Sequence, residues 1–258
     1  MSGLDNRLRV PGTRRLRAAI GVAGVRARYS ARATVSRYPW PFLAIVRRKY
    51  SGQIVDTETD VVIEASPRSG NTFAVVAFEL SQERPVKIAH HLHAAAQVTR
   101  GVRLDKPVLV LIRDPVEAVL SQLIREPGIT PRQGMWNWIR FYRSAEYVRK
   151  HILVATFEDV TTDFGSVIDR LNERFATSFV RFDHSRGNVE RCFRQIERRN
   201  RSTYSRLVES KISRPSSARN AAKESLRPRL LEPRMQPLLE TAYRLRDSLV
   251  DRGAHIDR

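Results

Sequence analysis

Six consecutive residues, Pro67-Arg68-Ser69-Gly70-Asn71-Thr72, could bind an anion where a strand gives way to a helix. Gly70 lets the backbone approach a ligand closely. The free N–H groups and the dipole at a helix start favour negative charge, and Arg68 adds a full positive charge. These residues predict a phosphate or sulfate cradle. The alternative is an ordinary turn whose helix is capped by Ser or Thr.

The cradle differs from the P-loop of nucleoside triphosphatases. The pattern Gly-x-x-x-x-Gly-Lys-Ser/Thr is absent, and the residue directly after Gly70 is Asn71 where the P-loop has its Lys. A conventional ATPase or kinase is therefore disfavoured.

A second anion site is predicted at Arg113 and Ser121, eight residues apart. Arg113 follows the continuous apolar run of residues 106–112, which is typical of a central parallel strand. Ligands of parallel sheets bind at the carboxyl ends of such strands. The alternative is a surface pair of Arg113 with Asp114 and a Ser on a helix surface.

The elements that must position these residues alternate between strands and helices. We expect strands at 60–66, 85–90, 106–112 and 151–157, and helices at 73–82, 92–103, 116–126, 134–149, 164–175 and 230–250. This alternation predicts an α/β fold, a three-layer α/β/α arrangement with a central parallel sheet. Residues 186–229, with 13 basic and 4 acidic residues, predict a polar loop region.

Charge is concentrated at the N-terminus. The chain has a net charge of +19, and residues 1–50 contain 12 basic residues and one acidic residue, Asp5. We expect residues 1–50 to form a basic arm and 51–258 the main domain. The arm could be a flexible surface segment, a basic amphipathic helix on an anionic membrane, or a transit-like peptide. The single cysteine, Cys192, excludes an internal disulfide and indicates a cytoplasmic protein, at the membrane periphery if the arm binds there.

Together the two motifs resemble those of the sulfotransferases that use 3′-phosphoadenosine 5′-phosphosulfate (PAPS). That family has a Pro-Lys/Arg-Ser-Gly-Thr/Asn-Thr loop after its first strand, and later a strand-end Arg followed by a Ser eight residues on. The segment Phe157-Glu158-Asp159-Val160 also resembles the family's Tyr-Glu-Asp-Leu. The resemblance implies the P-loop nucleoside-triphosphate-hydrolase-like fold and a sulfotransferase domain over residues 51–258.

The resemblance also implies roles for individual residues. Arg68 would contact the bridging and sulfuryl oxygens, Arg113 and Ser121 the 3′-phosphate, and Phe73 replaces the family's Trp. The residues assigned to the 5′-phosphate are Ser69, Gly70, Asn71 and Thr72. The family's Gly-rich C-terminal loop is absent, and the basic segment in its place could supply Arg214, Arg219 or Lys223 to the nucleotide.

Histidine suits the catalytic base, because its ordinary pKa lies near neutrality. In the hydroxyl-sulfating members of the family the His precedes the 3′-phosphate Arg by about twenty residues, and His91 lies 22 residues before Arg113. We therefore predict His91, with His90 next. Adjacent residues of a continuing strand point in opposite directions, so we expect only one of the two to face the site. Glu64 and Glu79 are the carboxylate alternatives.

The predicted reaction transfers a sulfuryl group from PAPS to a hydroxyl of a sugar, lipid or small molecule, without a metal. An anionic membrane surface is the candidate partner of residues 1–50, and nucleic acid is not expected. One alternative is a phosphotransferase with a degenerate P-loop, for which Asp114 would bind a metal. The other is a non-enzymatic binder of nucleic acid or anionic membranes, whose affinity would fall steeply with salt.

Overall fold

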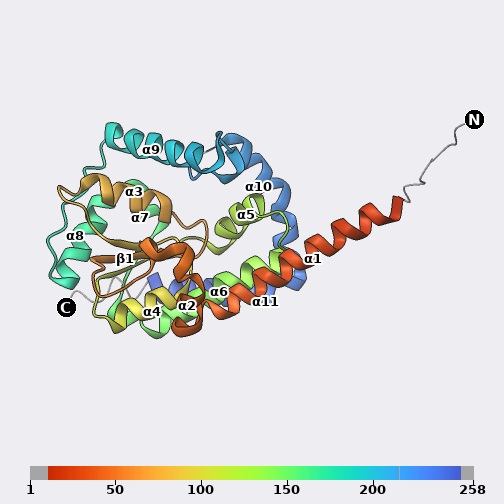
Figure 1. Ribbon diagram of the computed structural model, residues 1–258, viewed down its shortest axis with the longest axis horizontal. Coiled ribbons are helices and arrows are strands. Elements are labelled where there is room, and N and C mark those ends of the chain that lie inside the picture. The colour runs from red at the N-terminus through yellow and green to blue at the C-terminus, as the bar shows by residue number, and fades with distance from the viewer. Residues whose placement is uncertain (1–10, 215, 251–258) are drawn as a thin grey trace, which may run out of the picture.

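The computed structural model describes residues 11–214 and 216–250 (Figure 1). In this part of the chain four parallel strands form one sheet, in the order β2-β1-β3-β4. The strands are β1 (Val61–Ala65), β2 (Ile88–His90), β3 (Val108–Ile112) and β4 (Leu153–Thr156). β1 and β3 are completely buried, as the apolar residues of both strands predict, and the one charged residue of β1, Glu64, is buried with them.

Helices cover both faces of the sheet (Figure 1). On one face lie α3 (Asn71–Ser81), α7 (Phe157–Thr162), α8 (Phe164–Phe175) and α9 (Arg186–Tyr204). On the other lie α4 (Ala95–Arg103), α5 (Pro115–Arg125), α6 (Pro131–Tyr147) and α11 (Gln236–Val250). Val61 and Ile63 pack with the first group and Val62 with the second, because successive strand side chains point to opposite faces. The predicted three-layer α/β fold is confirmed.

The order of the strands places a topological switch point between β1 and β3. The chain leaves β1 through α3 toward β2 on one side, and leaves β3 through α5 and α6 toward β4 on the other. The two connections diverge where Ala65 pairs with Leu111. Open parallel sheets bind ligands at such a point, outside the carboxyl ends of the strands. The predicted cradle and Arg113 both follow strands that end there.

The prediction of a polar loop over residues 186–229 is wrong. This region contains α9 and most of α10 (Ser217–Leu230), joined through a short 3-10 helix at Glu209–Lys211. The apolar residues Val189, Cys192, Phe193 and Ile196 recur at helical spacing and pack into the core beside α3. Their periodicity was obscured by the many arginines between them. The closing helix begins at Gln236, after a 3-10 turn at Pro233–Met235, and not at residue 230.

The N-terminal region is helical and is packed on the domain. α1 (Pro11–Val35) runs beside α6, and its N-terminal end extends beyond the rest of the fold (Figure 1). α2 (Pro39–Tyr50) continues into a 3-10 turn at Ser51–Gln53. The inner face of α2 forms a small buried cluster with the segment after β2: Phe42, Leu43, Val46, Leu92, Ala94 and Ala96. Residues 1–10 of the predicted arm lie outside the described residues, and the boundary at residue 50 stays a prediction.

A further 3-10 turn lies at Arg149–His151, before β4. Within residues 11–214 and 216–250, no helix combines the length and apolar composition that crossing a membrane requires.

Candidate active site

The loop after β1 has a backbone conformation that requires a glycine. Gly70 has φ of 93° and caps α3, and a Cβ added to it would lie 3.2 Å from the Phe157 ring. Arg68 also has a positive φ of 71°, which is a strained conformation for a residue with a side chain. Ser69 is fully buried, and its hydroxyl lies 3.4 Å from the hydroxyl of Tyr142 on α6. The loop is thus fixed from within the fold.

Arg68, Arg113 and Ser121 come together at the ends of β1 and β3. Arg68 donates from Nε to the Ser121 hydroxyl at 2.9 Å, and Arg113 donates from Nη1 to the backbone carbonyl of Arg68 at 3.1 Å. Arg68 also donates to the Ser213 hydroxyl at 3.1 Å and to the Ile212 carbonyl at 3.2 Å. The structure therefore joins the two predicted anion motifs and adds residues 212–213 to them.

The positive charges at this place are largely removed from water: Arg219 is buried, and Arg68, Arg113 and Arg125 are half-buried. Burial lowers the pKa of Arg68 to about 9, and the positive charges of Arg125, Arg219 and Arg113 act in the same direction. Arg219 is 9% exposed and donates to the Ile212 carbonyl at 2.6 Å. Like charges in a poorly solvated place repel one another, and an anion bound among them would relieve that cost. We call Arg68, Arg113, Arg125 and Arg219 the arginine cluster.

Arg113 has two further contacts that orient it. Its guanidinium lies 4.0 Å from the centre of the Phe157 ring, a cation–π geometry, and 3.7 Å from the Glu117 carboxylate. Glu117 also accepts from Lys223 and Arg227 of α10, each at 2.7 Å. Burial acts to raise the pKa of Glu117, but the hydrogen bonds from these two residues hold it below its ordinary value. Glu117 thus ties α10 to the helix that carries Ser121.

Asn71, the first residue of α3, has a buried side chain whose polar atoms are unused. It is 3% exposed, and neither its amide nitrogen nor its carbonyl oxygen has a hydrogen-bond partner among the described residues. Buried amides are almost always paired, because losing hydration without a replacement is costly. A ligand held by the loop could supply the missing partner.

The predicted base lies directly beside the loop. His91 Nε2 is 3.1 Å from the hydroxyl of Thr72, and His91 Nδ1 is 2.5 Å from Nδ1 of His90. β2 ends at His90, and His91 and His93 take left-handed conformations with φ of 59° and 49°. The strand does not continue, so the expectation of opposite directions for His90 and His91 does not apply: the two rings meet.

Burial holds the pKa of His91 well below its ordinary value, and the charges that His90 and His93 would carry act in the same direction. His91 is therefore a neutral imidazole at neutral pH, the form that can accept a proton. His93 Nδ1 lies 3.0 Å from the carbonyl of Ala65, at the end of β1.

Glu64 supports the histidine segment from inside β1. Its carboxyl group is fully buried and accepts hydrogen bonds from the backbone N–H of Leu92 at 2.9 Å and of His93 at 3.1 Å. Burial raises its pKa to about 8, with these hydrogen bonds opposing. The second carboxylate alternative, Glu79, is paired with Arg199 of α9.

Two residues predicted to contact the nucleotide, Phe73 and Arg214, contact other protein residues in this structure. The Phe73 ring is 6% exposed and packs against Phe182, Phe193 and His184 in the core. Arg214 lies 2.8 Å from Glu197 of α9. Their roles in nucleotide binding stay predictions.

Sequence reasoning missed Arg125, Ser213 and the structural role of Glu64. Arg125 was detectable, because it follows Ser121 by one helical turn and so shares its face. Glu64 was the one charged residue in an apolar strand, which signals a specific buried partner. Nothing near Ser213 in the sequence connects it with Arg68, 145 residues earlier.

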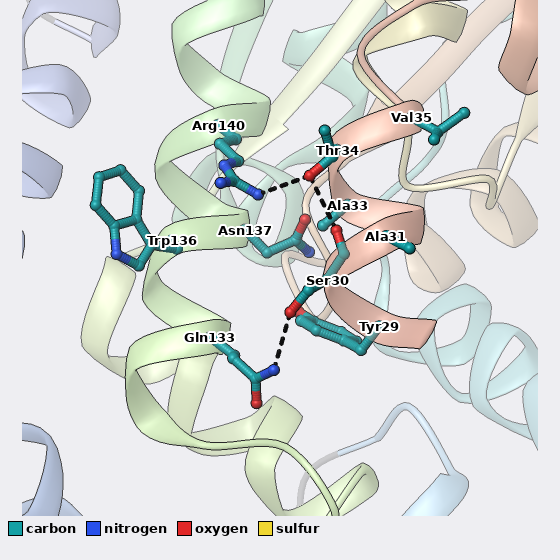
Figure 2. Close-up of a pocket in the computed structure, with 10 residues that line it drawn as sticks. All are labelled: Tyr29, Ser30, Ala31, Ala33, Thr34, Val35, Gln133, Trp136, Asn137 and Arg140. Carbon is teal, nitrogen blue, oxygen red and sulfur yellow. Dashed lines mark hydrogen bonds between the residues drawn. The ribbon is translucent and has the colours of Figure 1, made fainter. Parts of the chain in front are cut away.

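A pocket of about 430 Å³ lies elsewhere, between α1 and α6 (Figure 2). It is lined by residues 29–31, 33–35, 133, 136, 137 and 140. Across it Arg140 donates to the Thr34 hydroxyl at 3.1 Å and Gln133 to the Ser30 hydroxyl at 3.0 Å. None of the predicted site residues lines this pocket, whose polar side chains hold α1 on the domain.

Among the described residues, no group of three or more His, Cys, Asp or Glu side chains is placed to hold a metal ion. No protein-family model matches the chain, and no curated protein matches it.

One similar solved structure is that of mouse sulfotransferase SULT7A1 complexed with PAP. The two chains share 13% identity with a TM-score of 0.45, over 80% of this chain and 90% of that chain. This neighbour is a member of the family that the two sequence motifs resemble. At this identity and TM-score the similarity says nothing about activity, so the proposed function rests on the residues of the site.

Proposed function

We propose that this protein is a sulfotransferase that transfers a sulfuryl group from PAPS to an acceptor hydroxyl. The observation that carries the proposal is that Arg68, Arg113 and Ser121 meet. They lie in two separate motifs of the chain and are joined by hydrogen bonds beyond the carboxyl ends of β1 and β3. A largely buried arginine cluster beside a helix start can hold two anionic groups of one nucleotide.

The residues present fit such a donor. The unpaired amide of Asn71 and the first N–H groups of α3 would bind the 5′-phosphate, together with Ser69 and Gly70. Arg113 and Ser121 would bind the 3′-phosphate. In this structure the guanidinium of Arg68 is directed toward Ser121 and residues 212–213, so contacting the sulfuryl oxygens would require it to exchange these hydrogen bonds.

When bound, the donor supplies a sulfuryl group whose bond to the nucleotide phosphate oxygen is broken in the transfer. The chain must then remove a proton from the acceptor hydroxyl and stabilise the negative charge. Neutral His91 would take the proton on a ring nitrogen. That nitrogen must first exchange its present neighbour, the Thr72 hydroxyl or the His90 ring, for the acceptor. The arginine cluster would stabilise the charge.

The test is calorimetric titration with adenosine 3′,5′-bisphosphate, without added metal, of the unaltered protein and of Arg113→Ala. We expect micromolar binding, weakened in the variant by about 2 kcal/mol or more, a factor of about 30, because a charged hydrogen bond is lost. The matched control is Arg170→Ala on α8, another arginine that donates to a backbone carbonyl and pairs with a carboxylate. If adenosine 3′,5′-bisphosphate did not bind at moderate salt, the proposal would be wrong.

A further inference from the structure

Helix α2 carries large apolar side chains on the side packed against the domain and also on the side open to solvent, where Trp40 and Ile45, five residues apart, lie about 140° apart around the helix axis. Its inner face is buried on the domain, with Phe42 and Leu43 only 2% and 6% exposed. Its outer face leaves Trp40 85% and Ile45 71% exposed. On a helix already anchored by its buried side, these two exposed side chains are available to contact a partner.

The charged residues of the segment that carries this outer face are all basic. Arg37 lies just before α2 and Arg47, Arg48 and Lys49 lie in its last turn, and all four are exposed. The sequence contains no acidic residue between Asp5 and Asp56. A partner that complements this surface must therefore carry negative charge and also accept apolar side chains.

We propose that the outer face of α2 docks on an anionic lipid bilayer, with Trp40 and Ile45 in the headgroup region and the four basic residues on the lipid phosphates. Tryptophan favours the membrane interface, and Lys and Arg beside it gain from the negative surface potential. The exposed apolar residues favour a bilayer over nucleic acid, whose backbone would use the basic residues alone. The helix lies in the plane of the interface and does not cross it.

Docking through α2 also orients the candidate active site. α2 packs on Leu92 and Ala94, on either side of His93 and next to His91 in the chain. The end of α1 adds two hydrogen bonds, from Arg32 to the Leu92 carbonyl at 3.1 Å and from the Ala96 N–H to the Ser36 carbonyl at 2.9 Å. The segment that carries His91 thus lies about one helix diameter, ~10 Å, from the docked face. If the proposed function holds, docking through α2 would bring the candidate active site close to the hydroxyl groups of membrane lipids.

The test is co-flotation of the full chain with vesicles of phosphatidylcholine alone or mixed with phosphatidylglycerol. We expect binding to the mixed vesicles, a decrease of at least tenfold for Trp40→Ser with Ile45→Ser, and about a hundredfold for Arg47→Gln, Arg48→Gln and Lys49→Gln together. Tyr204→Ser, which removes an exposed ring from α9 on the other face of the sheet, serves as the control and should bind as before.

Thermal melting and nucleotide titration of each variant separate docking from folding and from the proposed function, because neither quantity should change. The proposal is overturned if the Trp40 and Ile45 variant floats like the unaltered protein. It is equally overturned if phosphatidylcholine alone binds as well as the mixture, or if a short DNA duplex binds more tightly than the vesicles and is insensitive to that variant.

Discussion

Arginine serves two different purposes in two regions of this molecule. Around α2, Arg47 and Arg48 are exposed and project into solvent. At the ends of β1 and β3, Arg68 is half-buried and Arg219 is buried, and their guanidinium groups donate to hydroxyl and carbonyl oxygens. The first region has the higher density of charge in the sequence, but the charges of the second are less solvated and therefore interact more strongly with one another. The arginine cluster is therefore the candidate site for a specific anion because its charges are largely buried, and not because they are more numerous than those around α2.

The two regions should respond differently to salt. Exposed charges are screened over about 8–10 Å at ordinary ionic strength, whereas buried ones are screened much less. Binding of vesicles by α2 should therefore weaken more steeply with added salt than binding of adenosine 3′,5′-bisphosphate by the arginine cluster. If vesicle binding and nucleotide binding weakened equally with added salt, the proposed difference between the two regions would be wrong.

The largest effect is expected for Arg68→Met. It removes a positive charge from the proposed nucleotide site, so nucleotide affinity should fall at least about a hundredfold. It also removes three hydrogen bonds within the protein, to Ser121, Ser213 and Ile212. The free energy of unfolding should change little, because the repulsion from Arg125, Arg219 and Arg113 is lost as well. Calorimetry and urea unfolding measure the two quantities, and vesicle binding should be unaffected. Large destabilisation with intact nucleotide binding would show that Arg68 is a structural residue.

A smaller effect is expected for Asn71→Ala. Nucleotide affinity should fall about tenfold, because one hydrogen bond to a charged ligand is lost. The free energy of unfolding should stay the same or rise by about 1 kcal/mol, since a buried amide without a partner is removed. A binding loss combined with unchanged or higher stability is the signature of a residue kept for its ligand. Lower stability with unchanged affinity would contradict this.

The histidine segment predicts the pH dependence of stability. Burial lowers the pKa of His90 and of His93 to about 4, from an ordinary value of 6.5. Between these values the unfolded chain binds more protons than the folded one, so stability falls as pH decreases from 6.5 toward 4. Glu64, with its pKa raised to about 8, acts in the opposite direction and partly offsets this loss. Urea unfolding across this range should show the decline, and His93→Asn should reduce it.

The smallest effect is expected for Glu117→Gln. The side chain is partly exposed, so losing its charge beside Lys223 and Arg227 should cost no more than about 1 kcal/mol. The pKa of Glu117 is lowered in the folded protein. This stabilisation is therefore fully present above the ordinary pKa of a glutamate, and it is lost as pH falls through the lower pKa of the folded protein. Glu224→Gln, in the same ion-pair network but more exposed, is the control and should leave the unfolding midpoint unchanged.

Local patterns predicted much of the fold. Residues 60–66 were recognised as a strand and residues 106–112 as a central strand, and the helices after them begin within two residues of the expected positions. These elements were predictable because strand burial and helix periodicity depend on neighbouring residues. α9 was missed because its narrow apolar face is outnumbered by charged residues, and only its packing on α3 makes that face necessary.

The sequence by itself determined the fold class, the candidate anion-binding loop at residues 67–72, and the spacing of Arg113 and Ser121. Each of these follows from short-range chemistry: which residues form a strand, start a helix or tolerate a left-handed turn. Only the tertiary structure decided that Arg68 contacts Ser121 and Ser213, that His90 and His91 meet, and that Glu64 holds their segment. Those contacts join residues far apart in the chain or depend on where a strand ends, and sheet order and burial decide both.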